Sequence, residues 1–190
     1  MANANKELKK IMSDFNETYK AICAKSREDY IKSLGPGAMI PNDGPMIYTE
    51  DGKNYFTEEC RKYKAKAHEI LDTHVRNLKN KITEAPSTDA VNSITLLKLR
   101  DSITEKEISD LMERYGDNVQ AYNAINSIAH SHNINSFGDH PLNVRLENVK
   151  ALTENVDKTI TPWNKCISDG YIGFLGMDID SVFPEEGSDE

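Results

Sequence analysis

The sequence predicts an all-α protein, an elongated helical bundle with a long N-terminal helix and a small β-hairpin or loop insertion near residues 46–56. Three observations predict this class. Apolar residues recur at helical spacing, capping signals mark several boundaries, and hydrophobic residues are only 38% of the composition. A chain of 190 residues can bury a core, but this composition favours thin helical layers over a thick α/β core. We expect a helical domain over residues 1–167 and a separate tail, Gly-rich and then acidic, over residues 168–190.

Residues 4–34 carry the clearest helical pattern. A stripe recurs there at alternating steps of three and four, which is a heptad spacing: Leu8, Met12, Phe15, Tyr19, Ile22 and Ser26. Gly35-Pro36-Gly37 ends the helix, because glycine allows a left-handed cap and proline cannot continue a helix. A helix from Leu8 to Leu34 would be roughly 40 Å long, about the width of a compact globule of this size, so we expect an elongated molecule.

The segment 35–56 interrupts the helical pattern. The stretches 46–49 and 54–56 flank Asp51-Gly52, as two short strands flank a hairpin turn. An isolated hairpin is only marginally stable, so this one should pack on helices or on a partner. Its aromatic residues are predicted to form that docking surface: Tyr48, Tyr55 and Phe56. Thr57 is the expected N-cap of a second helix, which ends before Pro86.

Capping signals place further helices in the second half of the chain. The expected starts are Ser87 or Thr88, Thr104 and Asp117. The first of these helices would carry the apolar residues Val91, Ile94 and Leu97 and could extend to Leu99. Glu107 completes a capping box with the cap three residues earlier, and Gly116 ends that helix. A last stripe begins at Leu142, and we expect it to continue, kinked at Pro162, through Ile167.

Two histidine patterns are candidate metal sites. His68 and Asp72 have the i, i+4 spacing of a zinc-protease helix, but that helix would need a second histidine. His130, His132 and His140 could hold a metal only if the helix has ended by His130, since residues two apart on a helix diverge. Polar side chains facing a loop are the simpler interpretation of this cluster.

The remaining motifs select no chemistry. Cys23, Cys60 and Cys166 are odd in number and widely spaced, which indicates small, partly buried residues in a reducing compartment. A Cys–His nucleophilic pair stays open, although nothing selects its members. Asp178 and Asp180 begin like an EF-hand loop, which would then require a glycine in place of Phe183. We therefore expect no catalytic residue, cofactor or bound metal, and a protein that is not an enzyme.

The charge is unevenly distributed along the chain. The net charge of −8 argues against nucleic acid or an anionic membrane as the main partner. No basic residue follows Lys165, whereas residues 53–82 contain eight basic and four acidic residues. The simpler interpretation of the basic stretch is a solvated helix face, and the alternative is a contact with the acidic tail of the same or a neighbouring chain. The predicted interaction residues of these segments are Lys62, Lys66, Phe174, Asp178, Asp180, Glu185 and Glu186.

Residues 99–133 contain the pattern T-x-x-E … L-x-x-[KR]-Y-x-x-N, formed by Thr104, Glu107, Leu111, Arg114, Tyr115 and Asn118. This corner resembles small helical proteins from the structural modules of tailed phages and prophages of Gram-positive bacteria. The resemblance implies an assembly or virion-associated role and supplies no catalytic residues. The acidic C-terminal end departs from the basic shell-binding segment that scaffolding proteins of phages usually carry.

We therefore expect a non-enzymatic phage structural or assembly protein that self-associates through its heptad faces. Its partners would be further copies of itself and other phage structural proteins, in the cytoplasm of the bacterial host or in the virion. No membrane contact is expected, since the longest apolar stretch, residues 171–177, is far too short for a span. The alternative is a small intracellular binding or inhibitor protein that uses its acidic tail against a basic partner.

Overall fold

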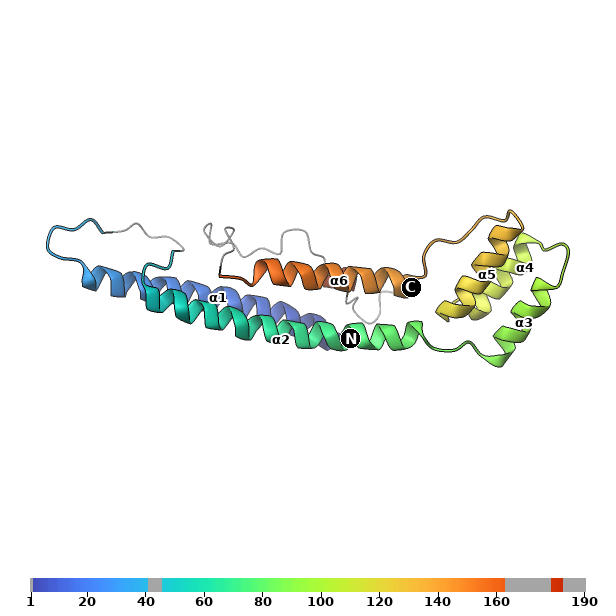
Figure 1. Cartoon of the computed structure of the whole chain (residues 1–190), viewed down its shortest axis with the longest axis horizontal. Coiled ribbons are helices and arrows are strands. Elements are labelled where there is room, and N and C mark those ends of the chain that lie inside the picture. The colour runs from blue at the N-terminus through green and yellow to red at the C-terminus, as the bar shows by residue number, and fades with distance from the viewer. Residues whose placement is uncertain (1, 41–45, 163–178, 183–190) are drawn as a thin grey trace. The chain divides into compact units, whose positions relative to one another are not determined.

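A computed structural model describes residues 2–40, 46–162 and 179–182, and their regular secondary structure is entirely helical, as predicted (Figure 1). The helices are α1 (Ala2–Ser33), α2 (Glu50–Ile82), α3 (Thr88–Lys98), α4 (Glu105–Tyr115), α5 (Val119–Ser131), α6 (Pro141–Thr159) and α7 (Ile179–Val182). The chain divides into two compact units: unit 1 comprises Met1–Asp72 and Val149–Glu190, and unit 2 comprises Thr73–Asn148. Helices α2 and α6 contribute to both. None of the described helices combines the length and apolar character that crossing a membrane requires.

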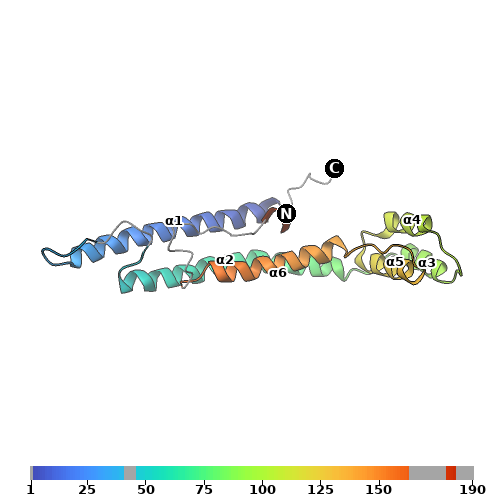
Figure 2. The ribbon, with the colours of Figure 1, turned by 90° about the horizontal axis from the view of Figure 1, so that it is seen from above.

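The heptad stripe predicted for α1 is the buried face of this helix. All six of its residues are at most 7% exposed: Leu8, Met12, Phe15, Tyr19, Ile22 and Ser26. The stripe packs against α2, which runs alongside α1 in the opposite direction (Figure 2). The ring centroids of Phe15 and Phe56 lie 5.9 Å apart, and those of Tyr19 and Phe56 lie 5.0 Å apart. Beyond the end of α1, Gly37 adopts a positive φ of 84°, which glycine tolerates without strain.

The hairpin predicted near residues 46–56 is not formed, because α2 already begins at Glu50. Asp51-Gly52 lies in the first turn of α2 instead of between two strands. Thr49 supplies the cap, since its Oγ1 accepts the backbone N–H of Gly52 at 3.2 Å. This cap and the burial of Phe56, which is 3% exposed, together outweigh the local turn preference of an Asp-Gly pair.

The predicted N-cap at Thr57 is also wrong, because α2 has already begun at Glu50. Thr57 lies inside α2, where its hydroxyl donates a hydrogen bond to the carbonyl oxygen of Lys53 at 2.9 Å. This is the bond that a threonine makes within a helix to the preceding turn. The second helix is therefore capped eight residues earlier than the sequence indicates, by Thr49 in place of Thr57.

In unit 1, α6 carries a buried apolar stripe that Ile160 continues beyond its end, and one polar cluster joins α6 to α2. Val149, Leu152, Val156 and Ile160 are fully buried. The Asp157 carboxylate lies 3.2 Å from Lys64 Nζ and 3.0 Å from His68 Nε2, both on α2. Helix α6 ends at Thr159, and its expected continuation from residue 163 to Ile167 lies outside the described residues.

Unit 2 is built on a three-helix core of α3, α4 and α5. Ile94 and Leu97 of α3 pack with Ile108 of α4 and with Ile125 and Ile128 of α5. The capping box at the start of α4 is confirmed: Thr104 Oγ1 accepts the N–H of Glu107 at 3.3 Å, and the Glu107 carboxylate accepts the N–H of Thr104 at 2.9 Å. The capping box and the burial of Ile108 in the core of unit 2 therefore both favour a helix at this position.

Two further starts can be compared with their predicted caps. Ser87 caps α3, because its side chain accepts the N–H of Ala90 at 3.1 Å. Helix α5 is capped by Asn118 and not by Asp117, since Asn118 Oδ1 accepts the N–H of Ala121 at 3.0 Å. The carboxamide of Asn118 also donates to the carbonyl oxygen of Glu84 at 3.0 Å. That second bond, to a residue far away in the sequence, explains why Asn118 takes the capping position.

Of the predicted tail, the structure describes only the short helix α7. Its Ile179 and Val182 are 7% and 2% exposed, and α7 contacts α1 within unit 1. The predicted interaction residues Phe174, Asp178, Glu185 and Glu186 lie outside the described residues, and so does the side chain of Asp180.

Candidate functional site

The aromatic residues predicted to form a docking surface are not brought together. Phe56 is in the core of unit 1, against Phe15 and Tyr19. Tyr48 stacks on Tyr30 of α1, with ring centroids 5.4 Å apart. Tyr55 lies on α2 and is 56% exposed. Of the three predicted residues, Tyr55 alone presents most of its surface to solvent.

Several basic side chains of α2 are already engaged by neighbours. Four of them form ion pairs of 2.6–3.3 Å: Lys53 with Glu50, Arg61 with Glu58, Lys62 with Glu59, and Lys64 with Asp157. Lys66 Nζ lies 5.3 Å from the centre of the Tyr63 ring, in cation–π geometry. Exposed pairs one turn apart contribute little stability, so these contacts fit the solvated-face interpretation. The contact of Lys62 and Lys66 with the acidic tail stays a prediction.

The histidines are placed in separate structural roles. His68 contacts Asp157 of α6 and not Asp72, its partner in the sequence motif. His130 lies exposed in the last turn of α5, and His132 caps the end of that helix. Over residues 2–40, 46–162 and 179–182, no three His, Cys, Asp or Glu side chains are arranged to hold a metal ion.

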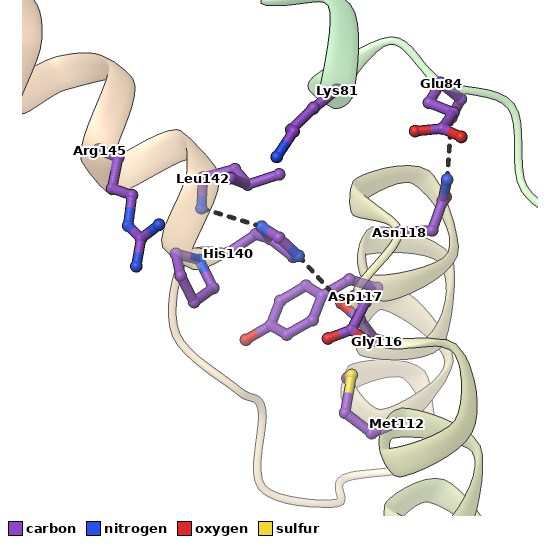
Figure 3. Close-up of a pocket in the computed structure, with 11 residues that line it drawn as sticks. Lys81, Glu84, Met112, Gly116, Asp117, Asn118, His140, Leu142 and Arg145 are labelled. Carbon is purple, nitrogen blue, oxygen red and sulfur yellow. Dashed lines mark hydrogen bonds between the residues drawn. The ribbon is translucent and has the colours of Figure 1, made fainter. Parts of the chain in front are cut away.

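His140 uses both nitrogens of its imidazole in bonds to the backbone (Figure 3). Its Nε2 lies 2.9 Å from the carbonyl oxygen of Gly116, and its Nδ1 lies 3.1 Å from the backbone nitrogen of Leu142. A carbonyl only accepts and an N–H only donates, so the ring is neutral and carries its proton on Nε2. The carbonyl of His140 accepts the first bond of α6, from Asn143, at 2.8 Å. His140 is therefore the N-cap of α6 and a link to the α4–α5 corner.

A pocket of about 680 Å³ surrounds this histidine within unit 2. It is lined by the end of α2, the α4–α5 corner and the start of α6, and Figure 3 shows these three segments converging on His140. Its uncharged polar side chains serve the fold: Asn118 donates to Glu84, and the Tyr122 hydroxyl donates to the carbonyl of Gly138 at 2.8 Å. The pocket therefore lies at a structural joint.

Charged side chains of both signs line the same pocket, Lys81 and Arg145 against Glu84 and Asp117. Lys81 and Arg145 also act on the nearby His74. Burial lowers the pKa of His74, and the positive charges of Arg145 and Lys81 lower it further, so this histidine is held neutral. The mixed charge gives the pocket no preference for an anion or a cation.

The two described cysteines are buried in unit 1. Burial raises the pKa of the Cys60 thiol to about 12 and also raises the pKa of Cys23. A thiol is nucleophilic only as the thiolate, so neither side chain is activated for chemistry. Cys166 lies outside the described residues.

The most exposed apolar surface of unit 2 belongs to α3. Leu96 is 66%, Leu99 77% and Val91 46% exposed. Of the apolar residues predicted for this helix, Ile94 and Leu97 are the buried ones, each 6% exposed, and Leu99 lies at the C-cap. The sequence did hold a signal: Leu96 and Leu97 are adjacent, so on a helix they point to different sides and cannot share one buried face.

A groove of about 310 Å³ continues this surface between α3 and α4. Its floor includes Leu97 and Leu111, and Leu96 lies at its edge. Its charged residues are Arg100, Glu107, Asp110 and Arg114, two of each sign. We refer to the surface formed by the groove-lining residues Leu96, Arg100, Glu107, Asp110, Leu111 and Arg114, together with the exposed Leu99 that directly precedes Arg100, as the α3–α4 face.

The charged side chains of the α3–α4 face differ in their pairing. Arg100 forms a short ion pair with Glu107, which connects the end of α3 to the first turn of α4. Asp110 and Arg114 are exposed and form no ion pair with any residue that the structure describes. Two leucines and two opposite, uncommitted charges thus occupy one surface of unit 2, which makes it the best candidate for an interaction site.

Comparisons with protein-family models, with curated proteins and with solved structures found no match to this chain. The candidate site is therefore interpreted from its own chemistry. It offers apolar side chains and exposed charges to a partner, whereas Cys23 and Cys60 are buried, His140 is bonded to the backbone and His68 contacts Asp157.

Proposed function

We propose that this protein is a non-enzymatic structural or assembly protein of the phage or prophage type, which self-associates through its helices. The exposure of Leu96 on α3 and of Leu99, the C-cap of that helix, carries the proposal. Leaving large apolar side chains in water forgoes the main driving force of folding and association, and a chain with only 38% hydrophobic residues has few to leave there. Burial of this surface between copies of the chain would recover that stabilisation.

The placement of the potentially reactive groups supports a role outside catalysis. The Cys60 thiol has a raised pKa in the core, and both ring nitrogens of His140 form hydrogen bonds with backbone groups. His68 is held by Asp157, which also contacts Lys64 and fixes α6 to α2. Each group stabilises a helix end or a helix pair.

The corner that resembles phage structural proteins supports the assignment to that class. Thr104 and Glu107 form the capping box of α4, Asn118 caps α5, and the Tyr115 hydroxyl donates to Asp89 of α3. The residues of the pattern thus cap the starts of α4 and α5 and bond α4 to α3. The pattern therefore supports the phage class through a likeness of architecture alone.

Sedimentation velocity over a wide range of protein concentration tests the proposal. We expect the average mass to rise with concentration, and a protein that stays monomeric at its solubility limit would contradict the proposed function. Removing residues 178–190 should leave this behaviour unchanged, because the α3–α4 face lies elsewhere in the chain. If the truncation abolished association, the contact between the acidic tail and the basic stretch of α2 would be favoured instead.

A further inference from the structure

We propose that the α3–α4 face binds the same face of a second copy of this chain about a two-fold axis, with Asp110 of each copy paired to Arg114 of the other. This inference rests on the proposed function and names the surface and the partner through which it operates. Three features of the face support it: its leucines, its groove and its balance of charge.

The exposed leucines of the α3–α4 face favour its burial by a partner. Ala90, Ile94 and Leu97 turn one side of α3 into the core of unit 2. Leu96 and Leu99 lie outside that core and are 66% and 77% exposed. A second copy that covers them removes four leucine side chains from water in one symmetric contact, because each contact in a two-fold interface occurs twice.

The groove gives those leucines a place to insert. It lies between α3 and α4, and its apolar lining comes from Leu96, Leu97 and Leu111. Its volume of about 310 Å³ exceeds that of one leucine side chain. A leucine of the second copy can therefore enter it, while the groove of that copy receives the equivalent leucine.

The charges select a second copy over other occupants. Asp110 and Arg114 lie one turn apart on α4, so a two-fold axis passing between them places each beside its opposite in the other copy. Arg100 and Glu107 already neutralise each other. A strongly acidic or basic partner, such as a nucleic acid, would meet as many like charges as opposite ones.

Charge reversal in the full-length chain tests this pairing. Asp110→Arg alone and Arg114→Asp alone should each place like charges together twice per dimer, and should raise the dissociation constant of self-association at least about tenfold. An equimolar mixture of these two variants should associate again, because the two introduced side chains then face each other with opposite charges, as do the two that are left unchanged. The double variant should also associate. Glu28→Arg, a reversal of an exposed charge on α1 and outside the α3–α4 face, is the control and should behave as wild type.

Sedimentation velocity separates the outcomes, with circular dichroism to check that each variant is folded. Loss of association in both single variants and its recovery in the mixture would establish the two-fold pairing. If the wild type associates and the single variants associate equally well, the pairing is refuted while the proposed function stands. Leu96→Glu then provides an independent readout, since unchanged association in that variant would exclude the α3–α4 face altogether. A wild type that never associates would overturn both proposals.

Discussion

His140 donates its Nε2–H to the carbonyl oxygen of Gly116 at 2.9 Å, so the first residue before α6 is bonded directly to the end of α4. The other ring nitrogen accepts the N–H of Leu142 at 3.1 Å and caps α6. The Tyr122 ring packs edge-on against the imidazole, with centroids 4.9 Å apart. One buried neutral histidine thus joins two helix ends, a task that a serine or aspartate cap could only half perform.

Replacing this histidine should destabilise unit 2. His140→Ala leaves the N–H of Leu142 and the carbonyl of Gly116 without their partner and removes a ring that is only 4% exposed. We expect a loss of about 1–3 kcal/mol in the free energy of unfolding, measured by urea denaturation. His130→Ala, at an exposed position of α5, is the control and should change stability by less than about 0.5 kcal/mol. Equal stability of the two variants would show that the link contributes nothing.

Gly116 should not tolerate a side chain. A Cβ built there collides with the carbonyl oxygen of Met112, which belongs to the rigid backbone of α4 and accepts the Gly116 N–H at 2.7 Å. Gly116→Ala is therefore expected to lower the melting temperature, because the end of α4 must shift. Gly138→Ala is the matched control, since a Cβ there meets nothing within 4 Å. Thermal denaturation that ranks the two variants in the opposite order would contradict this account.

Ser26 should be essential for the start of α2. Its Oγ accepts the backbone N–H groups of Tyr48 and Thr49, each at 2.8 Å, and it is 2% exposed. Ser26→Ala leaves both groups without this acceptor and should cost about 1–3 kcal/mol of stability. Ser33→Ala, which removes only a bond to the preceding turn of α1, should be nearly neutral. Hydrogen exchange at Tyr48 and Thr49 would report the effect locally, and unchanged protection there would refute it.

The capping box of α4 should make stability depend on pH in the acid range. Hydrogen bonds from the backbone and side chain of Thr104, with further help from Arg100, lower the pKa of Glu107 from 4.5 to about 2. Because the pKa is lower in the folded state, its contribution is fully present above pH 4.5 and is lost as the pH falls towards 2. Glu107→Gln keeps an acceptor at this position but does not titrate.

The difference in urea midpoint between wild type and Glu107→Gln should therefore shrink as the pH falls from 5 to about 2. Glu113→Gln, on the same helix but outside the capping box, should follow the wild-type profile. A difference between wild type and Glu107→Gln that stays constant over this range would mean that ionised Glu107 does not stabilise α4.

Much of the architecture could be predicted because it depends on neighbours in the sequence. The stripe of α1 follows from residue spacing alone, and each predicted member from Leu8 to Ser26 is buried. The capping box of α4 involves Thr104 and Glu107, three residues apart, so its signal is complete within one turn. Ser87 and Ala90 form the cap of α3 over the same distance.

The failures occurred where distant residues decide between local alternatives. Asp51-Gly52 is a good hairpin turn by itself, but the segment before it is fixed by Ser26 of α1, and Phe56 packs on Phe15 and Tyr19. Asp117 and Asn118 are comparable caps in isolation, and only the bond from Asn118 to Glu84 distinguishes them. Contacts between residues so far apart cannot be predicted from the spacing of residue types along the sequence.

The candidate site shows the same division. The sequence by itself determined that α3 carries more apolar residues than one face can bury. The tertiary structure alone decided that Ile94 and Leu97 turn inward against α4 and α5, and therefore that Leu96 and Leu99 remain outside. Helical periodicity fixes which residues share a face, because it acts over a few residues. The choice of the face that is buried depends on the surfaces of other helices, which meet α3 only when the chain has folded.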